Sequence, residues 1–449
     1  MTTPPPADTA RPDESPRSNR ADAVEIIRTL RAAGHVAYLA GGCVRDELLG
    51  FAPKDFDVAT DAPPDRVRRL FPRTQPVGAA FGVILVRHGG SVIEVATFRA
   101  DGDYRDGRHP ENVRFSTPED DARRRDFTVN ALFLDPLDAD RVIDHVGGLD
   151  DLRAKTLRAV GEPRQRFAED YLRMLRAARF ASRLGFTIDP ATADAVVEHA
   201  SRLAQISPER INDELQRMLT PPTRVEAWRL LWKLHLTPVL FRFLQEPVDP
   251  DAVLAGGAAA PAMLFPQVGL GRSISAPLAL ASAVLCYRRQ AVCSRSIRQL
   301  LEPGEVRRSV SSLRRALRLS NDDSEGIAWC LRFGQVLGDQ RPTVATIKRF
   351  MAQPHADDAR ALLRALATTD TATELSAQVA WVESRVESLI GTEFAPERLV
   401  TGDDLIAAGL SPGPLFKRVL EQAYDEQLEG RLTTREEALL FAITAAARG

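Results

Sequence analysis

The hydrophobic pattern of the 449-residue chain changes at Gly147-Gly148, and this change limits the folds that the chain can adopt. From Ala23 to about Gly148, helix-like periods alternate with short apolar segments typical of strands, such as Val36 to Ala40. Beyond that point long helical periods rich in Arg, Ala and Leu follow, and strand signals largely disappear. The pattern therefore predicts an α+β protein whose mixed N-terminal part precedes an all-helical remainder.

The composition excludes several classes of protein. The longest apolar run, Ala276 to Tyr287, is shorter than the roughly 20 residues that span a bilayer, so no membrane segment is expected. The four cysteines form neither a CxxC pair nor a dense framework, which argues against a disulfide scaffold or structural zinc and fits a reducing cytoplasm. A formal net charge of -2 conceals clusters of arginine, so a nucleic-acid partner is not excluded.

A glycine pair follows the first predicted strand. Gly41-Gly42 permits a tight turn between that strand and a helix predicted from Cys43 to Leu49. Free backbone N–H groups at the start of such a helix favour an anion, and Arg45 adds a forked donor for a phosphate one turn later. The same glycines would also serve an ordinary strand-turn-helix junction.

Two aspartates follow after a short gap. Asp55 and Asp57 stand at i and i+2, so their side chains point to the same side if the segment is extended. Two like charges repel unless a cation lies between them, and magnesium prefers such hard oxygen ligands. The pair suits metal-assisted phosphoryl or nucleotidyl transfer, although a solvated acidic pair in a loop is the alternative.

Two further segments place charge beside apolar residues. Glu94 puts a carboxylate into an apolar predicted strand, which is costly unless the carboxylate is paired or faces water at an edge. Arg124-Arg125-Asp126 combines two cations with a carboxylate, as suits phosphate or metal binding, or else a salt-bridged helix start. Either Glu94 or Asp126 could be a third carboxylate near the metal.

A strong helix former runs from Glu169 to Arg179. Four charged residues in it share one row of i, i+3 spacing, namely Asp170, Arg173, Arg176 and Arg179. The pattern alone favours an amphipathic helix with an Asp-Arg salt bridge over a binding role for this row.

In this order, the segments GGCVRD, KDFD, IEVATFR, RRDFTVNAL and EDYLRMLRAARF resemble the class II branch of the nucleotidyltransferase superfamily. That branch comprises CCA-adding tRNA nucleotidyltransferases and bacterial poly(A) polymerases. The resemblance covers residues 36 to about 215, and it implies a nucleotidyltransferase head domain with a mixed five-stranded sheet, followed by an all-helical neck, body and tail. The expected division is a disordered leader at 1–21, the head at 22–150, the neck at 151–215, an RNA-binding body at 216–395 and the tail at 396–449.

The resemblance also implies roles for individual residues. Asp55 and Asp57 are the expected magnesium ligands, and they join Asp126 as the expected catalytic carboxylates. The expected nucleotide-binding residues are Gly42, Arg45, Arg125, Asp170, Arg173, Arg176 and Arg179.

The matching helix of the family reads the incoming base, and the chemistry of Asp170 and Arg173 fits that role. Cytosine and adenine both present an amino donor next to a ring-nitrogen acceptor, so an Asp acceptor beside an Arg donor pairs with either. Guanine and uracil reverse this order and would be repelled.

The activity implied by the resemblance is magnesium-dependent addition of C, C and A to the tRNA 3' end from CTP and ATP, with release of pyrophosphate. The alternatives are a poly(A) polymerase, a partial CC-adding or A-adding enzyme, and a catalytically silent RNA-binding protein. The segment Gly78 to Val83 and the loop Asp101 to Pro110 resemble the CCA-adding form, and Thr401 to Pro414 resembles its tail. The intact catalytic residues argue against a silent binder. Neither a membrane nor a stable protein partner is expected.

Arginines at helical spacing in the second half, Arg307, Arg308, Arg314, Arg315 and Arg318, could form a basic face for RNA phosphates or simply a solvated surface. No His-Asp dyad typical of an appended phosphohydrolase domain is found, so phosphatase activity is not expected.

Overall fold

The computed structural model describes residues 16–76, 82–101, 113–256, 265, 267–269, 271–291, 297–336, 341–369 and 373–447. The chain divides into two compact units, Met1–Gln205 and Ile206–Gly449. The first unit contains the strands that the sequence predicts before Gly148, and the second is helical throughout its described part.

The first unit is built on a seven-stranded sheet with the order β3-β4-β5-β2-β1-β8-β9. Its strands are β1 (Ala37–Ala40), β2 (Asp57–Thr60), β3 (Thr74–Pro76), β4 (Val83–His88), β5 (Ser91–Thr97), β8 (Phe133–Asp135) and β9 (Arg141–Ile143). Strands β2 and β5 run parallel, and all the other neighbours in this sheet are antiparallel. The sheet is therefore mixed, as predicted.

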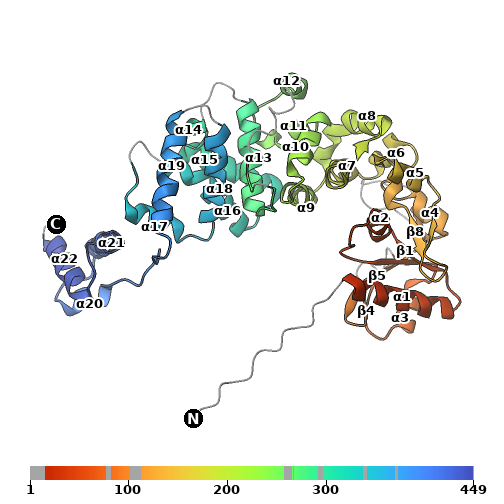
Figure 1. The fold of residues 1–449 in the computed structure, drawn as a ribbon, viewed down its shortest axis with the longest axis horizontal. Coiled ribbons are helices and arrows are strands. Elements are labelled where there is room, and N and C mark those ends of the chain that lie inside the picture. The colour runs from red at the N-terminus through yellow and green to blue at the C-terminus, as the bar shows by residue number, and fades with distance from the viewer. Residues whose placement is uncertain are drawn as a thin grey trace, which may run out of the picture. The chain divides into compact units, whose positions relative to one another are not determined.

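One face of this sheet is covered by helices. In β5 the residues Ile93 and Val95 are buried, whereas Val92 and Glu94 are exposed, which is the alternation expected of a strand with one covered face. Helix α1 (Pro16–Ala32) and helix α3 (Pro64–Leu70) pack against the covered side, beside β4 and β5 in Figure 1. The Ser91 hydroxyl donates to Asp22 of α1, which fixes the side that this helix covers. Glu94 consequently faces away from α1.

The remaining elements of the first unit follow the sheet strands. The helices are α2 (Gly42–Leu48), α4 (Pro118–Arg123), η2 (Thr128–Asn130), α5 (Gly148–Arg153), α6 (Pro163–Glu169), α7 (Leu172–Leu184), α8 (Pro190–His199) and η3 (Ala200–Gln205). Two small ribbons pair β6 (Arg99–Asp101) with β7 (Val113–Phe115) and β10 (Thr156–Leu157) with β11 (Thr187–Ile188).

The second unit consists of helices. They are α9 (Pro208–Leu219), α10 (Arg224–Lys233), α11 (Thr237–Leu240), η4 (Arg242–Leu244), α12 (Pro250–Ala255), α13 (Ala276–Ala291), α14 (Ile297–Leu300), α15 (Pro303–Leu317), α16 (Asn321–Val336), α17 (Val344–Met351), α18 (Ala356–Thr369), α19 (Thr373–Ser388), α20 (Gly402–Ala407), α21 (Pro414–Leu428) and α22 (Arg435–Ala447). Helix α16 packs against α13, α15 and α18 (Figure 1). The last three helices share a separate buried cluster around Leu405, Val419 and Ala442.

Two details differ from the sequence predictions. The sheet has seven strands where five were expected, and its edge strands β3 and β9 contain only three residues each, too few to produce a detectable hydrophobic period. Helix α1 begins at Pro16 and so includes residues that the sequence assigned to the leader 1–21. The division into head, neck, body and tail stays a prediction. Across the described ranges, every helix is too short or too polar to cross a bilayer.

Candidate active site

Two carboxylates lie side by side on the open face of the sheet. Asp57 is the first residue of β2, and it pairs in register with Glu94 of the parallel strand β5. Residues paired across a ladder point to the same face, so both carboxylates project on the side opposite α1. Asp55 lies two residues before Asp57 and is exposed. Of the two candidates for a third carboxylate, the register places Glu94 next to Asp57.

The charges at this point of the sheet are not balanced. Burial raises the pKa of Asp57 to about 6, and repulsion from Glu94 and Asp55 adds to the shift, while Arg125 opposes it. Partial desolvation also raises the pKa of Glu94, again against the attraction of Arg125, although the Glu94 residue is itself exposed. Asp57 is therefore repelled by Glu94 and Asp55, and Arg125 opposes this repulsion.

This set of oxygen donors fits a hard divalent cation. A cation between Asp55 and Asp57 would relieve the repulsion that raises the pKa of Asp57. No group of three or more His, Cys, Asp or Glu side chains lies close enough to form a complete metal cage among the residues that the structure describes. Two carboxylates suit magnesium, which keeps several water or phosphate ligands of its own.

Arg125 reaches the same region from the other side of the glycine turn. Its guanidinium donates to the carbonyl of Asn130 (3.1 Å) and to the buried carboxylate of Asp121 (3.0 Å), and it lies 5.1 Å from the ring centre of Phe133. Gly41 has φ +76°, and a β-carbon at Gly41 would lie 2.7 Å from Nη1 of Arg125. The turn favours glycine because its backbone conformation is strained for any other residue and because a β-carbon would displace the end of the Arg125 side chain.

Gly41→Ala should therefore lower the free energy of unfolding by about 1–3 kcal/mol, because the left-handed backbone is strained with a side chain present. The matched control is Gly50→Ala, since Gly50 also has φ +76° but has open space around its α-carbon. We expect Gly41→Ala to cost about 1 kcal/mol more than the control, the worth of the displaced Arg125 hydrogen bond. Equal costs in urea unfolding would show that Arg125 does not depend on the glycine.

Helix α2 holds an arginine that is almost completely buried. Arg45 is 1% exposed, and its guanidinium donates to Asp46 (2.6 Å) and to the side-chain oxygen of Asn130. Burial lowers the pKa of Arg45, against the attraction of Asp46. Asp46 also accepts from Arg183 of α7 at 2.8 Å. Arg45 thus fixes α2 against η2 and α7, and its predicted contact with a triphosphate stays a prediction, as does that of Gly42 at the first position of α2.

Asp126 is the centre of a second link to α7. Its carboxylate is buried and accepts from Arg176 (2.6 Å) and from the Asn130 amide (3.1 Å). Burial alone would raise the pKa of Asp126, but Arg176 and these hydrogen bonds outweigh it and lower the pKa to about 2. Each carboxylate oxygen accepts from one of these partners, as is typical of a positioning residue, and the catalytic role expected of Asp126 from the sequence stays a prediction.

The structure gathers three of the expected nucleotide-binding arginines around one ring. The guanidinium carbons of Arg179, Arg176 and Arg45 lie 4.2, 5.1 and 5.2 Å from the ring centre of Phe180. Phe180 is buried on α7, and it also makes an edge contact with Phe127 at 5.9 Å. Cation–π attraction to this ring holds positive charge together where repulsion would otherwise spread it.

The predicted helix over 169–179 is interrupted at Asp170, which corrects the single charged row expected from the sequence. Helix α6 ends at Glu169 and α7 begins at Leu172, and between them the Asp170 carboxylate accepts from the backbone N–H of Leu172 at 3.0 Å. Aspartate competes for local backbone N–H groups in this way, which favours a helix start over a helix interior. Asp170 therefore stands at the entrance of α7, two residues before its first residue, Leu172.

Arg173 is held on three sides. It donates to the carbonyls of Arg166 (2.7 Å) and Arg124 (3.2 Å) and to the carboxylate of Glu169. The contact with Arg124 joins the start of α7 to the end of α4, close to Arg125 in sequence. The contact thus links Arg173, on the helix predicted to read the base, to the arginine-rich segment that contains Arg124.

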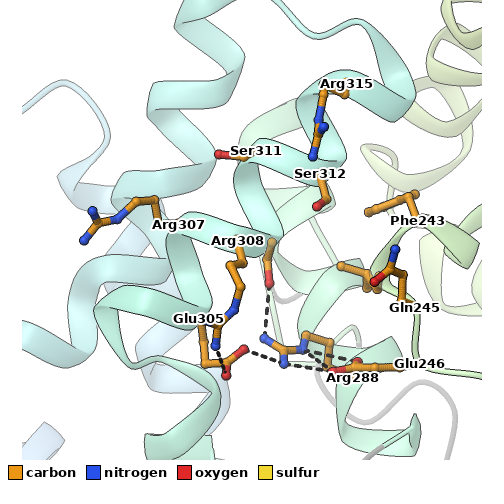
Figure 2. Close-up of a pocket in the computed structure, with 12 residues that line it drawn as sticks. Phe243, Gln245, Glu246, Arg288, Glu305, Arg307, Arg308, Ser311, Ser312 and Arg315 are labelled. Atoms are coloured by element: carbon orange, nitrogen blue, oxygen red, sulfur yellow. Dashed lines mark hydrogen bonds and ion pairs between the residues drawn. The ribbon is translucent and has the colours of Figure 1, made fainter.

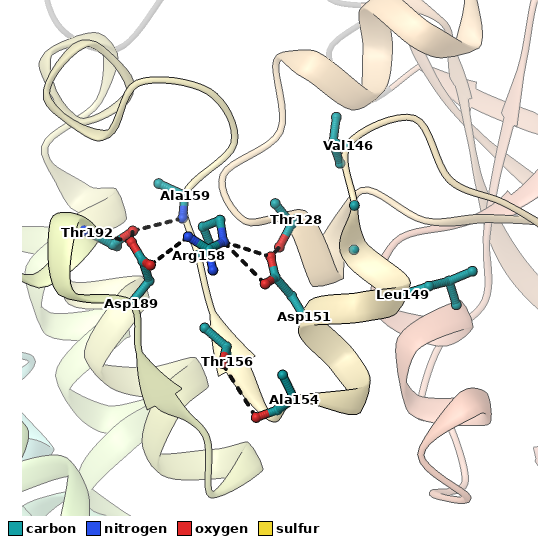
Figure 3. Close-up of polar contacts among 12 residues, drawn as sticks. Thr128, Val146, Leu149, Asp151, Ala154, Thr156, Arg158, Ala159, Asp189 and Thr192 are labelled. Atoms are coloured by element: carbon teal, nitrogen blue, oxygen red, sulfur yellow. Dashed lines mark hydrogen bonds and ion pairs between the residues drawn. The ribbon is translucent and has the colours of Figure 1, made fainter.

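Several residues of this region were missed from the sequence. Arg158 bridges Asp151 of α5 (3.1 Å) and Asp189 before α8 (2.6 Å), and Asp151 also accepts from the Thr128 hydroxyl at 2.7 Å (Figure 3). Asp189 in turn caps α8 through Thr192. The contacts of Thr128 with Asp151 and of Arg158 with Asp189 join residues 23 and 31 positions apart, so the local pattern carried no signal for them. Asp46, the missed partner of Arg45, had a local signal because it adjoins Arg45 in the GGCVRD segment.

Some sequence predictions fall outside the described residues. They are the segment Gly78 to Phe81 and most of the loop Asp101 to Pro110. At the other end of the chain, Thr401 caps α20 by a reciprocal contact with Asp404, which gives the Gly/Pro-rich tail segment an ordinary helix start.

Two family models match the chain. Residues 37–158 match the "Poly A polymerase head domain", and residues 185–246 match the "Probable RNA and SrmB- binding site of polymerase A". The first range includes the carboxylates of β2 and β5, and the second begins directly after α7.

Curated relatives are similar to the chain over different lengths. The CCA-adding enzyme of Geobacillus stearothermophilus is 44% identical over 220 residues, which are 49% of this chain and 54% of that one. The chain thus spans about half the length of this relative in the alignment. The CCA-adding enzyme of Lactiplantibacillus plantarum is 32% identical over 425 residues, covering 92% of this chain and 93% of that one.

Solved structures agree with these relatives. A Bacillus stearothermophilus CCA-adding enzyme in complex with CTP has a TM-score of 0.71 and 30% identity, and the match covers 95% of this chain and 98% of that one. A Thermotoga maritima CCA-adding enzyme complexed with tRNA shares the fold with a TM-score of 0.61 and 19% identity, covering 94% and 98% of the two chains.

Proposed function

We propose an activity from the premise that the chain belongs to the family of CCA-adding enzymes, to one of which it is 32% identical over 92% of its length. The proposed reaction is the addition of C, C and A to the 3' end of tRNA from CTP and ATP. The tRNA 3'-hydroxyl attacks the α-phosphorus of the nucleotide, a new phosphodiester bond forms, and pyrophosphate leaves with the electrons of the broken P–O bond.

The observation that carries this proposal is the in-register pair Asp57 and Glu94 facing Arg125 across the glycine turn. Enzymes of the nucleotidyltransferase class typically use a divalent metal, and we propose magnesium held by Asp55 and Asp57. When bound, the metal would stabilise the negative charge that develops on the phosphate oxygens and lower the pKa of the attacking hydroxyl.

The side chains around the metal position the nucleotide. Arg125 is fixed by Asp121 and Asn130 and offers positive charge to the triphosphate at the glycine turn. Arg176 and Arg179, held over Phe180, extend this positive charge along α7. Arg45 and Asp126 keep α2, η2 and α7 in a fixed arrangement, so the triphosphate and the base meet groups that are already oriented.

We assign base choice to Asp170 and Arg173 at the entrance of α7. Asp170→Ala and Arg173→Ala should each weaken discrimination against GTP and UTP by about 10- to 100-fold, because one paired donor-acceptor contact is worth roughly 1–3 kcal/mol. The measurement is kcat/KM for all four nucleotides in single-nucleotide addition. Unchanged misincorporation in both variants would contradict the assignment.

A matched control for those variants is Glu169→Ala. Glu169 accepts from Arg173 and Arg166 at the same junction but is not expected to touch the base. This variant should lower the thermal stability and leave the KM for nucleotides nearly unchanged. Its preference for CTP and ATP should equal that of the parent.

The decisive experiment supplies purified protein, magnesium, CTP, ATP and tRNA that lacks its 3' end, and then sizes the products. Extension by three nucleotides supports CCA addition. A long ladder from ATP alone supports poly(A) synthesis, the activity named in the head-domain match. Extension that stops after C or requires a pre-existing CC end indicates a partial CC-adding or A-adding enzyme.

The proposed partners are the tRNA 3' end, CTP and ATP, and the proposed location is the cytoplasm. We also propose that residues 22–150 form the catalytic head, that 151–215 form a neck carrying the base-reading helix, and that the body at 216–395 and the tail at 396–449 bind RNA.

A further inference from the structure

The second unit contains a polar cavity of about 680 Å³ beside helix α15. One wall is the segment Phe243 to Glu246 at the end of η4, and the other is the exposed side of α15 with Arg307, Ser312 and Arg315 (Figure 2). Its lining is dominated by charged and hydroxyl side chains, which suits a polar ligand better than an apolar one.

The acidic groups in this cavity are already neutralised. Arg288 is 4% exposed, and it forms ion pairs with Glu246 (2.9 Å) and Glu305 (2.8 Å) and donates to the Ser309 hydroxyl at 3.1 Å. In Figure 2 this network lies at the bottom of the view, and Arg308 forms an ion pair with Glu305 within α15. Two arginines therefore balance the two glutamates, and the network forms a rigid base for the helix above it.

Two arginines that line the cavity, Arg307 and Arg315, take no part in this network. Within the part of the chain that the structure describes, Arg307 and Arg315 have neither an ion pair nor a side-chain hydrogen bond, and both are exposed. They lie two turns apart on α15, so they share a face with Ser311 between them. Among the described residues, no acidic side chain forms an ion pair with Arg307 or Arg315.

The same face continues past the cavity. A second hollow of about 590 Å³ is lined by Ser311, Arg314, Arg315 and Arg318. Arg314 donates to the Asn321 side chain, and Arg318 pairs with Glu209 across 3.3 Å with both side chains more than half exposed. From Arg307 to Arg318 the row extends about 16 Å at about 1.5 Å per residue, which is long enough to follow a polymer.

We propose that this α15 surface, formed by Arg307, Ser311, Arg314, Arg315 and Arg318, binds the phosphate backbone of the RNA substrate. The inference rests on the proposed function. Forked guanidinium donors and hydroxyl groups are the usual partners of phosphate oxygens, and they recognise the backbone independently of sequence. The opposite wall, Phe243 to Glu246, falls inside the segment that matches the RNA-binding model. The phosphate-binding side chains of α15 and the match to the RNA-binding model therefore both support this surface.

The test is the double variant Arg307→Gln/Arg315→Gln in the full chain. Binding to tRNA that lacks its 3' end is measured by fluorescence anisotropy over a range of KCl, without nucleotide. Each lost phosphate contact should reduce the slope of log K against log salt by about 0.7–0.9, so the double variant should lose about 1.5. We also expect about tenfold weaker binding at low salt, a higher KM for tRNA and an unchanged KM for CTP.

Two control variants isolate the effect of position. Arg141→Gln/Arg153→Gln removes the same charge from exposed sites in the other unit, where each arginine pairs with a neighbouring aspartate, and should keep the parental slope. Arg307→Lys/Arg315→Lys keeps the charge and should keep most of the slope. A salt slope in the Gln variant equal to the parent's overturns the proposal, and so does weakening that the Arg141/Arg153 control reproduces.

The binding measurement also separates this inference from the proposed function. A parent protein that binds tRNA but adds no nucleotides refutes the activity, while the slope of the Gln variant still decides the surface. A different outcome would favour a protein partner. In that outcome RNA binding is equal in the parent and the Gln variant, and an acidic peptide such as poly-glutamate displaces a labelled probe from the parent only. The surface would then serve an acidic protein partner, and the RNA proposal would fail.

Discussion

Asp57→Asn should lower the rate of nucleotide addition by about 1000-fold or more while tRNA binding stays within about twofold of the parent. The change removes a metal ligand's charge, and metal-borne stabilisation of the transition state is worth several kcal/mol, which corresponds to about three powers of ten in rate. RNA binding should persist because the Asp57 carboxylate repels the phosphate backbone and contributes no contact to it. The measurements are single-turnover addition of CTP and anisotropy with the same tRNA.

The thermal stability of this variant supplies a readout independent of activity. The pKa of Asp57 is raised, so the folded protein binds a proton more tightly than the unfolded chain, and ionisation at neutral pH costs stability. Without divalent metal the variant should melt at the parental temperature or above it. Millimolar magnesium should raise the Tm of the parent more than that of the variant, because a ligand stabilises only a folded state that binds it.

Asp150→Asn is a suitable control, since Asp150 is a largely exposed aspartate of the same unit whose only described ion pair is with Arg153. It should leave addition, magnesium response and Tm unchanged. An Asp57→Asn variant with parental activity would refute the assignment of Asp57 to the metal, and one that lost tRNA binding together with activity would point to misfolding instead.

Asp126→Asn should reduce the free energy of unfolding by about 2–3 kcal/mol, which lowers the Tm by roughly 5–10 °C for a unit of this size. The substitution removes the buried carboxylate that pairs with the Arg176 guanidinium, and removing one partner of a buried ion pair costs more than the lost hydrogen bond alone. Arg176 is 32% exposed, which keeps the expected loss below that of a fully buried pair.

The double variant Asp126→Asn/Arg176→Met tests this cause. It removes both partners, so it should recover most of the lost stability, whereas a loss caused by other contacts of Asp126 would persist. Activity separates the two roles considered for this residue. A positioning residue predicts a loss of activity that follows the loss of stability and partly returns with it, while a catalytic carboxylate predicts an equally inactive double variant.

The loss of stability in acid also tests the interaction between Asp126 and Arg176. The pKa of Asp126 is lowered to about 2, so its contribution to stability is complete above the ordinary aspartate pKa near 4 and disappears as the pH falls toward 2. The Asp126→Asn variant should lack this part of the acid sensitivity. A parental decline of stability between pH 4 and pH 2 in the variant would show that other carboxylates are responsible.

The sequence was sufficient wherever the signal is local. The turn at Gly41-Gly42 and the spacing of Asp55 and Asp57 depend on neighbours in the chain, and the structure shows the strand, turn and helix that these residues predict. The change to helical structure after Gly148 is likewise visible in the period of the apolar residues.

Features that depend on contacts between residues distant in the chain could not be predicted from the sequence. Strand register places Glu94 beside Asp57, and Arg176 pairs with Asp126, and neither neighbour can be read from the local pattern. The break at Asp170 was hidden because the residues around it are strong helix formers, while one side-chain hydrogen bond decides the conformation. Arg183 joins Asp46 across 137 residues of chain.

The parallel pairing of β2 with β5 has a consequence for the order in which the chain folds. A slip of one residue would turn either Asp57 or Glu94 to the helix-covered face, so the carboxylate pair exists only in one register. Parallel neighbours cannot be joined by a tight hairpin, and here the chain passes through α3, β3 and β4 before the two strands meet. Contacts of this kind form late because loop closure must come first. The carboxylate pair, and any chemistry that depends on it, therefore exists only once the seven-stranded sheet is complete.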